Sequence, residues 1–190
     1  MLRGFQVLGF DLETTGFAAN KHKIVQYAFV GSDVNNLHIN VESLVNPGIK
    51  IPIETTRIHG ISDADVKKSL IFKNHVNTIS NLVNGSIIVG HNVIAFDWPF
   101  LEMEYLRCGI KKPKPYLIID TLVLARKFKI EHFGSKKLGS LCDKFGITLE
   151  RAHSADADAG ATLLLLWEIM KAYPNKFQNW WDTQIKSLSD

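Results

Sequence analysis

Gly9-Phe10-Asp11-Leu12-Glu13-Thr14-Thr15-Gly16 places two carboxylates at the end of an apolar run, directly before a small polar turn. Alternate residues of a strand point to the same face, so a strand here projects Asp11 and Glu13 together and Leu12 to the opposite side. Two neighbouring carboxylates repel each other unless a positive charge lies between them. A divalent cation such as Mg²⁺ is one solution, although solvated acids at a surface strand end are the commoner origin of a D-x-E pattern.

The composition is typical of a soluble globular protein, with 46% hydrophobic and 22% charged residues in a chain of 190. No apolar run reaches the roughly 20 residues of a membrane span, and the N-terminus has no signal-peptide pattern. We therefore expect a cytoplasmic protein with no membrane partner. Cys108 and Cys142 predict buried, reduced thiols rather than a disulfide framework.

The net charge is +3, and the basic residues are grouped. The groups are Lys111, Lys112 and Lys114, then Arg126, Lys127 and Lys129, and finally Lys136 and Lys137. Basic patches around an acidic site would suit a polyanionic substrate such as nucleic acid. Each group taken alone also fits an ordinary solvated surface.

The apolar patterning predicts an α/β protein with a mixed five-stranded sheet and helices on both faces. The expected strands are 5–12, 23–31, 37–45, 87–89 and 116–119, and the expected helices are 69–82, 98–108, 121–128, 137–145 and 155–172. Asn46-Pro47-Gly48 and Pro52 predict irregular chain between the third strand and the first helix. Residues 173–190 carry Trp180 and Trp181 without clear periodicity, which leaves a packed cap and a partner surface as alternatives.

Two further segments carry acids. Asp97 closes His91-Asn92-Val93-Ile94-Ala95-Phe96-Asp97 near the start of a predicted helix, where the helix dipole stabilises any carboxylate. Asp158 is the last residue of His153-Ser154-Ala155-Asp156-Ala157-Asp158, at the entry to the helix predicted over 155–172. His153 and Asp158 would point about 140° apart on one helix, so a shared site requires His153 on the preceding loop, with Ser154 as the N-cap. A capped helix start with a surface histidine fits the same residues.

Taken together, these segments resemble the DEDDh (DnaQ-like) family of 3′→5′ exonucleases in the ribonuclease-H-like superfamily. That family includes the proofreading subunits of bacterial replicative polymerases, of the polymerase III epsilon type. Residues 11–16 match its D-x-E-T-T-G motif, residues 92–97 its second motif and residues 153–158 its H-x-A-x-x-D motif. The sequences Ile58-His59-Gly60-Ile61 and Leu138-Gly139-Ser140-Leu141-Cys142 are similar to further family segments.

One departure concerns the branch of the family. Three residues separate Asn92 from Phe96-Asp97, whereas the bacterial proofreading subunits usually have two. Animal repair exonucleases and B-family polymerase proofreading domains have the longer spacing. The resemblance therefore leaves the branch open and implies a ribonuclease-H-like exonuclease domain over residues 1–172, with 173–190 as its C-terminal extension.

The resemblance also implies a site that works with two divalent metal ions, Mg²⁺ or Mn²⁺. Asp11, Glu13 and Asp158 would bind one ion and Asp11 would also contact the second, with Asp97 completing the acidic set. His153 would be the general base, since an unperturbed histidine titrates near neutral pH.

Substrate contacts are expected from residues beside these motifs. They are Thr14, Thr15 and Gly16 through backbone N–H groups, Phe17 and Phe96 through stacking on bases, His59 through the terminal sugar or phosphate, and Asn92. Core packing is the alternative for both phenylalanines. The expected activity releases nucleoside monophosphates from the 3′ end of single-stranded or frayed DNA, in proofreading or repair, with a DNA polymerase as a candidate partner. The alternatives are an exoribonuclease and a non-catalytic nucleic-acid-binding or polymerase accessory module.

Overall fold

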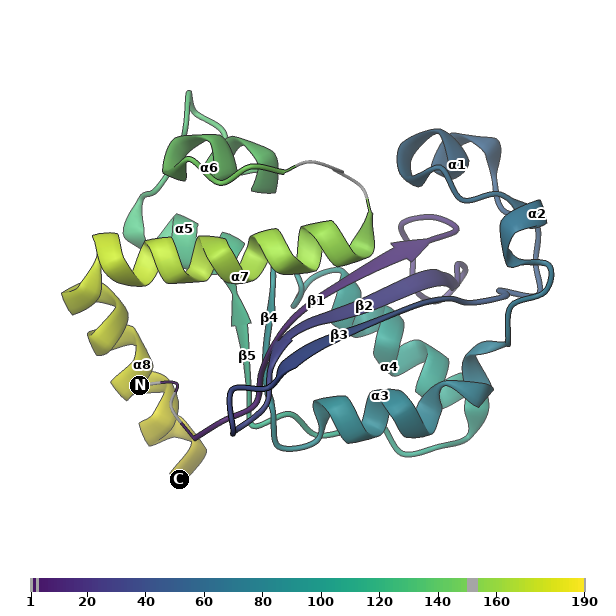
Figure 1. The fold of residues 1–190 in the computed structure, drawn as a ribbon, viewed down its shortest axis with the longest axis horizontal. Coiled ribbons are helices and arrows are strands. Elements are labelled where there is room, and N and C mark those ends of the chain that lie inside the picture. Colours follow the sequence, from purple (N-terminus) through teal and green to yellow (C-terminus); the bar gives the residue numbers. More distant parts are fainter. Residues whose placement is uncertain (1, 3, 150–153, 190) are drawn as a thin grey trace.

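The computed structural model describes residues 2, 4–149 and 154–189. Its centre is a five-stranded sheet with the order β3-β2-β1-β4-β5 (Figure 1). The strands are β1 (Val7–Thr14), β2 (Ile24–Ser32), β3 (His38–Leu44), β4 (Ile87–Gly90) and β5 (Leu117–Asp120). The first three form an antiparallel meander, and β4 and β5 run parallel to β1. The predicted mixed sheet is therefore confirmed.

Helices cover both faces of this sheet, which gives the three-layer ribonuclease-H-like architecture. One face packs on α3 (Val76–Val83) and α4 (Asp97–Cys108). The other packs on α5 (Thr121–Phe128), α6 (Leu138–Phe145), α7 (Ala155–Ala172) and α8 (Pro174–Ser189). Figure 1 shows the two helical layers above and below the strands.

Strand β1 lies at the centre of the sheet and separates the two apolar cores. Leu8, Phe10 and Leu12 belong to the core beneath α3 and α4, whereas Val7 belongs to the core beneath α7 and α8. The two-residue period of a strand therefore places Asp11 and Glu13 on the α7 face. This is the arrangement that the opening motif predicts.

The region between β3 and β4 differs from the prediction. Two short helices, α1 (Ile53–His59) and α2 (Asp63–Val66), occupy chain expected to be irregular. The helix expected over 69–82 begins only at Val76, after the 3-10 turn η1 (Phe72–Asn74). Ile71 is exposed and pairs by an isolated bridge with Asn46. Pro52 directly precedes α1, a position where its fixed φ and missing N–H do not interrupt helical hydrogen bonds.

The C-terminal residues form a helix that the sequence analysis missed. Phe177, Trp180 and Trp181 of α8 are buried in the core shared with β1, β4, β5 and α7. Their i, i+3, i+4 spacing is that of an apolar helical stripe. Pro174 starts this helix, a favoured place for proline, in addition to following α7. The packed-cap alternative is thus the correct one for the two tryptophans.

Two other expectations concern the cysteines and membrane crossing. Cys142 is buried in α6 and Cys108 is half-buried at the end of α4, and neither is in a disulfide. Burial raises the pKa of both thiols, that of Cys142 to about 11. Among residues 2, 4–149 and 154–189, no helix combines the length and apolarity required to cross a membrane.

Candidate active site

Three carboxylates converge where β1 meets the first turn of α7. Asp11 and Glu13 lie on β1, and Asp158 lies in the first turn of α7. Each offers an oxygen such that all three oxygens lie within 4.8 Å of one another. The structure therefore brings together residues that are about 145 positions apart in the chain.

This convergence requires α7 to approach the sheet closely. A Cβ at Gly9 would lie 2.1 Å from the carbonyl oxygen of Ala159, so only glycine fits at that position of β1. Ala28 on β2 packs with Ala155 and Ala159 in a small buried cluster. Small residues on both sides thus bring the helix backbone against β1 and place Asp158 beside Asp11.

The fourth carboxylate, Asp97, begins α4 and is buried. Its Oδ1 accepts a hydrogen bond of 3.1 Å from the backbone N–H of Leu12, the residue between Asp11 and Glu13. β1 pairs with β4 only over Val7–Gly9, so Leu12 lies beyond the paired segment. The carboxylate of Asp97 therefore takes the place of a strand partner and is fixed against the acidic motif.

The surroundings of the site raise the pKa of three of its carboxylates. Burial raises the pKa of Asp11 well above its ordinary value, with repulsion from Asp97, Glu13 and Asp158 adding to the effect. Burial, then Asp158 and Asp97, raises the pKa of Glu13 to about 8. Burial likewise raises the pKa of Asp97 to about 8, against the lowering effect of backbone hydrogen bonds.

Asp11, Glu13 and Asp97 have no ion-pair partner in the described part of the chain. There, no lysine or arginine nitrogen lies within 4.0 Å of a carboxylate oxygen of Asp11, Glu13 or Asp97. An all-oxygen, multiply anionic donor set suits a hard divalent cation. The residues present therefore fit a hard divalent cation.

The predicted general base, His153, lies outside the described residues. Ser154, which follows it, precedes α7 as expected, and its carbonyl oxygen accepts the N–H of Asp158 at 3.0 Å. The expected N-cap bond from its side chain is absent within the described chain, because the Ser154 hydroxyl donates to Oδ1 of Asp156 at 2.5 Å.

The turn after β1 is built by the residues expected to contact substrate. Thr15 is fully buried, and its N–H donates to the carbonyl oxygen of Lys23 at 2.9 Å. The hydroxyl of Thr14 donates to the carbonyl oxygen of Gly16 at 2.7 Å. A Cβ at Gly16 would lie 2.4 Å from the ring of His22. The N–H of Thr15 is therefore engaged in the β1–β2 turn, and its contact with a nucleotide stays a prediction.

Two aromatic rings lie beside the acidic motifs. Phe17 follows the turn and is 79% exposed, and Phe96 immediately precedes Asp97 and is half-buried. Their ring centroids are 6.4 Å apart at 55°, and Phe96 also contacts Phe100 of the core at 5.1 Å. Core packing therefore explains part of Phe96 and none of Phe17.

Two other expected contacts lie on separate elements. His59 ends α1, and its Nδ1 accepts the N–H of Ile61 at 3.0 Å. In Figure 1, α1 lies at the same end of the molecule as the C-terminal end of β1. Asn92 has a positive φ of 68° on the loop after β4.

Asp120 is a site-supporting residue that the sequence analysis missed. It is buried at the end of β5, and its oxygens accept the N–H groups of Asn92 (3.0 Å) and Ile94 (3.1 Å) as well as those of Leu122 and Val123. The carboxylate therefore caps α5 and also ties down the loop that leads to Asp97. An aspartate after an apolar strand does signal a helix N-cap, but its reach to the neighbouring loop depends on the sheet order.

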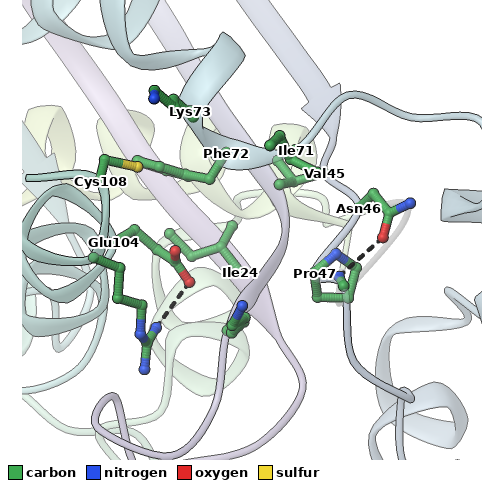
Figure 2. Close-up of a pocket in the computed structure, with 12 residues that line it drawn as sticks. Ile24, Val45, Asn46, Pro47, Ile71, Phe72, Lys73, Glu104 and Cys108 are labelled. Atoms are coloured by element: carbon green, nitrogen blue, oxygen red, sulfur yellow. Dashed lines mark hydrogen bonds and ion pairs between the residues drawn. The ribbon is translucent and has the colours of Figure 1, made fainter.

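A separate hollow lies away from the acidic cluster. Figure 2 shows it between Ile24, Val45, Phe72 and Cys108, with Glu104 ion-paired to Arg107 on one wall. Its volume is about 290 Å³, and none of the expected site residues lines it. It is therefore distinct from the acidic site at the end of β1.

The β3-β2-β1-β4-β5 sheet, with carboxylates at its centre and on the first turn of α7, defines a ribonuclease-H-like α/β protein. The family model described as Exonuclease (RNase_T) matches residues 8–166. The chain accordingly belongs to this exonuclease family, of the DEDDh (DnaQ-like) type.

Curated relatives agree with this membership. The chain is 35% identical over 162 residues to the PolC-type DNA polymerase III of Listeria innocua serovar 6a, covering 85% of this chain and 11% of that protein. It is 33% identical over 186 residues to the PolC-type DNA polymerase III of Lactococcus lactis subsp. lactis, covering 95% of this chain and 11% of that protein. The chain thus spans about a tenth of the length of these relatives.

Solved structures share the fold. A structure of exonuclease I superposes with a TM-score of 0.81 at 22% identity, covering 92% of this chain and 43% of that one. E. coli exonuclease I in complex with a dT13 oligonucleotide gives a TM-score of 0.78 at 21% identity, with 92% and 43% coverage. At this level of identity the likeness concerns the fold.

Proposed function

We propose that this chain is a divalent-metal-dependent 3′→5′ exonuclease that releases nucleoside monophosphates from single-stranded or frayed DNA. The observation that carries the proposal is the convergence of Asp11, Glu13 and Asp158, with Asp97 hydrogen-bonded to the strand between the first two. Membership of the exonuclease family and the DNA bound by E. coli exonuclease I support it. Residues 1–172 would form the exonuclease domain and 173–190 its extension.

In this proposal the acidic set would hold two divalent ions, which would stabilise the charge of the phosphate and lower the pKa of the attacking water. Asp11, Glu13 and Asp158 would be the direct ligands, a role that the 4.8 Å spacing of their oxygens supports. Asp97 fixes the backbone of Leu12 and so holds Asp11 and Glu13 in register. His153 takes the proton from the attacking water, as its motif position suggests.

Recognition of the terminal nucleotide is assigned to the aromatic pair. Phe17 is exposed and Phe96 is anchored on Phe100, so a base can stack on or wedge between an exposed and an anchored ring. Stacking of a base on an aromatic ring contributes roughly 1–3 kcal/mol irrespective of sequence. His59, Asn92 and the backbone of Gly16 are further proposed contacts to the same nucleotide.

A polymerase connection follows from the named relatives. The two curated relatives described above are PolC-type DNA polymerase III enzymes. We therefore propose removal of misincorporated 3′ nucleotides, in association with a DNA polymerase, as the biological setting. Repair of free 3′ ends is the alternative setting on the same chemistry.

The test uses 5′-labelled DNA and RNA oligonucleotides of matched sequence, with Mg²⁺, Mn²⁺ or EDTA. A ladder that shortens from the 3′ end of DNA, and is absent in EDTA and in Asp11→Asn, supports the proposal. Asp182→Asn, an exposed aspartate on α8, is the matched control. Faster RNA degradation would make the chain an exoribonuclease, and oligonucleotide binding without any ladder would make it a binding module.

A further inference from the structure

A cavity of about 440 Å³ lies beside the proposed active site. It forms where the loop after β4 meets α5 and the start of α6. Its polar lining consists of His91, Asn92, Arg126, Lys136 and Lys137. Asn92 belongs to the loop that ends at Asp97, so the cavity and the acidic site share one loop.

The cavity brings together two basic groups that are about ten positions apart in the chain. Lys136 is paired with Glu131 at 2.7 Å. Arg126 and Lys137 are exposed, and within residues 2, 4–149 and 154–189 neither has a carboxylate oxygen within 4.0 Å. The nearby carboxylate of Asp120 is buried and accepts four backbone N–H groups. Arg126 and Lys137 therefore offer positive charge that no ion pair in the described chain occupies.

An exposed aromatic ring lies on the turn that directly precedes Lys136. His132 and Ser135 exchange two backbone hydrogen bonds of 2.9 Å and close a two-residue hairpin turn directly before Lys136. At its tip, Phe133 is 96% exposed and has a φ of 49°, and Gly134 has a φ of 76°. A left-handed conformation costs a residue such as Phe roughly 1–2 kcal/mol, and a solvent-exposed ring recovers none of that cost by burial. Folding alone does not account for a phenylalanine there.

The hairpin is hydrogen-bonded to the loop that follows β4 through His91. Nε2 of His91 lies 3.0 Å from the carbonyl oxygen of Lys136, and because a carbonyl only accepts, Nε2 carries the proton. Nδ1 of the same ring lies 2.9 Å from the hydroxyl of Thr121 at the start of α5. One half-buried imidazole thus joins the hairpin, α5 and the loop that carries Asn92.

The cavity lies along the same edge of the sheet as the carboxylates. β1, β4 and β5 are parallel and adjacent, so their C-terminal ends form one edge. Asp11 and Glu13 lie at the end of β1, Asn92 follows β4, and Asp120 ends β5. Neighbouring strands are about 4.8 Å apart, so the cavity begins roughly 10 Å from the acidic site. A short length of single strand can span that distance.

We propose that this cavity binds the phosphodiester backbone of the substrate strand on the 5′ side of the nucleotide being removed, and that Phe133 stacks on one of its bases. Cations that follow the backbone, together with aromatic rings that hold bases, are the combination that binds single strands without sequence preference. The inference rests on the proposed exonuclease function for the direction of the strand. Arg126 and Lys137 would contact phosphates, and His91 would hold the hairpin in place.

The first experiment reverses the two exposed charges. Binding of a fluorescent 12-nucleotide DNA strand is measured in EDTA as a function of salt for wild type, Arg126→Glu/Lys137→Glu, and the control Lys171→Glu/Lys186→Glu. We expect Arg126→Glu/Lys137→Glu to bind the strand at least about tenfold more weakly than wild type. The slope of log affinity against log salt concentration should be shallower by about 1.4, since each single-strand phosphate contact contributes roughly 0.7. Equal affinities and slopes in the two variants would overturn the proposal.

The second experiment separates stacking from folding at Phe133. Phe133→Asn creates an Asn-Gly pair, which the two positive φ values favour. This variant should therefore unfold at the same or a higher temperature while binding the strand roughly 5- to 100-fold more weakly. Phe133→Trp should restore binding, and Leu106→Ala, which truncates an exposed side chain on α4, should leave binding unchanged. Wild-type affinity in Phe133→Asn would exclude the stacking role.

Two further arms distinguish this inference from the proposed function. Hydrolysis of a mononucleotide nitrophenyl ester requires only the acidic site, so Arg126→Glu/Lys137→Glu should retain the wild-type rate with Mn²⁺. If the wild type hydrolyses neither the ester nor DNA, the exonuclease proposal is refuted. The binding measurements in EDTA still test whether the cavity binds the strand. If inorganic phosphate binding depends on Arg126 and Lys137 but strand binding does not, the cavity holds a free anion and the inference fails.

Discussion

The backbone N–H of Leu12 donates a 3.1 Å hydrogen bond to Oδ1 of Asp97. The bond joins the middle of the D-x-E motif on β1 to the first residue of α4, across 85 positions of sequence. Both groups are buried, so the bond is not shared with solvent. Asp97 therefore has two roles that substitutions can separate, one as a member of the anionic set and one as the acceptor that aligns β1.

Asp97→Asn and Asp97→Ala should separate these roles. The side-chain amide of Asp97→Asn keeps a carbonyl acceptor for Leu12, so we expect a near-native melting temperature and a kcat lower by roughly 10²- to 10³-fold. The alanine variant leaves the buried N–H of Leu12 without an acceptor and should lose a further 1–3 kcal/mol or so of stability. Thermal unfolding and single-turnover hydrolysis measure the two effects. Equal stability of the two variants would show that the hydrogen bond does not align the strand.

A similar separation applies to Asp120, the carboxylate between α5 and the Asn92 loop. Asp120→Ala should destabilise the fold by about 2–4 kcal/mol, because it removes a helix cap and the acceptor of two loop N–H groups. If Asp120 positions Asp97 through this loop, kcat should also fall at assay temperatures well below the melting temperature.

Asp33→Ala is the matched control for Asp120. Asp33 also accepts two backbone N–H groups, those of Asn35 and Leu37 at 2.8 Å, but it lies in the β2–β3 turn. Asp33→Ala should therefore lower the stability of the fold without lowering kcat at the same assay temperature. A native kcat in Asp120→Ala would limit Asp120 to a structural role.

The sequence was sufficient for the sheet and for the carboxylates because their signals are local. A run rich in β-forming residues locates β1, and the alternation of side chains along a strand puts Asp11 and Glu13 on one face. It was insufficient for α1, which is short and leaves Ile53 and Ile58 exposed, and for α2, which has only four residues. In α8 the stripe is present, but Pro174 also fits a position just past the end of α7, so the sequence does not indicate a new helix there.

Contacts across the sheet are the part of the site that could not be predicted. Gly9 matters because Ala159 lies above it, and Asp120 matters because β5 is adjacent to β4. Neither relationship can be recognised from the residues that flank Gly9 or Asp120 in the sequence. Thr15 is a different case. Its motif predicts a substrate contact through the backbone N–H, whereas in the structure this N–H donates to the carbonyl oxygen of Lys23 in the turn. The roles assigned to His59, Asn92 and Gly16 stay predictions.

The raised pKa values make the stability of the metal-free protein depend on pH. The pKa of Glu13 is about 8 in the folded protein and near 4.5 when unfolded, so the folded state binds this proton more tightly. The resulting stabilisation is complete below about pH 4.5 and is lost as the pH rises to about 8. The melting temperature in EDTA should therefore fall across this range, and less steeply in Glu13→Gln.

Divalent cations should reverse that trend. Deprotonated Asp11, Glu13 and Asp158 bind a cation more tightly, so Mn²⁺ or Mg²⁺ should raise the melting temperature more at pH 8 than at pH 5.5. Cation binding at pH 7 should also release protons, measurable by calorimetry in buffers of different ionisation enthalpy. A melting-temperature shift that is the same at both pH values, or that persists in Asp11→Asn, would place the cation elsewhere.

His153 is the remaining member of the predicted catalytic set, and its role can be tested by kinetics alone. His153→Ala should lower kcat by about 10²- to 10⁴-fold, the usual contribution of a general base, with little change in DNA affinity. The wild-type pH–rate profile should rise through an apparent pKa near that of histidine, and this limb should vanish in the variant. His38→Ala, an exposed histidine on the edge strand β3, should keep both the rate and the profile. If the rising limb persists without His153, the limb belongs to the carboxylates with raised pKa values, and His153 is not the base.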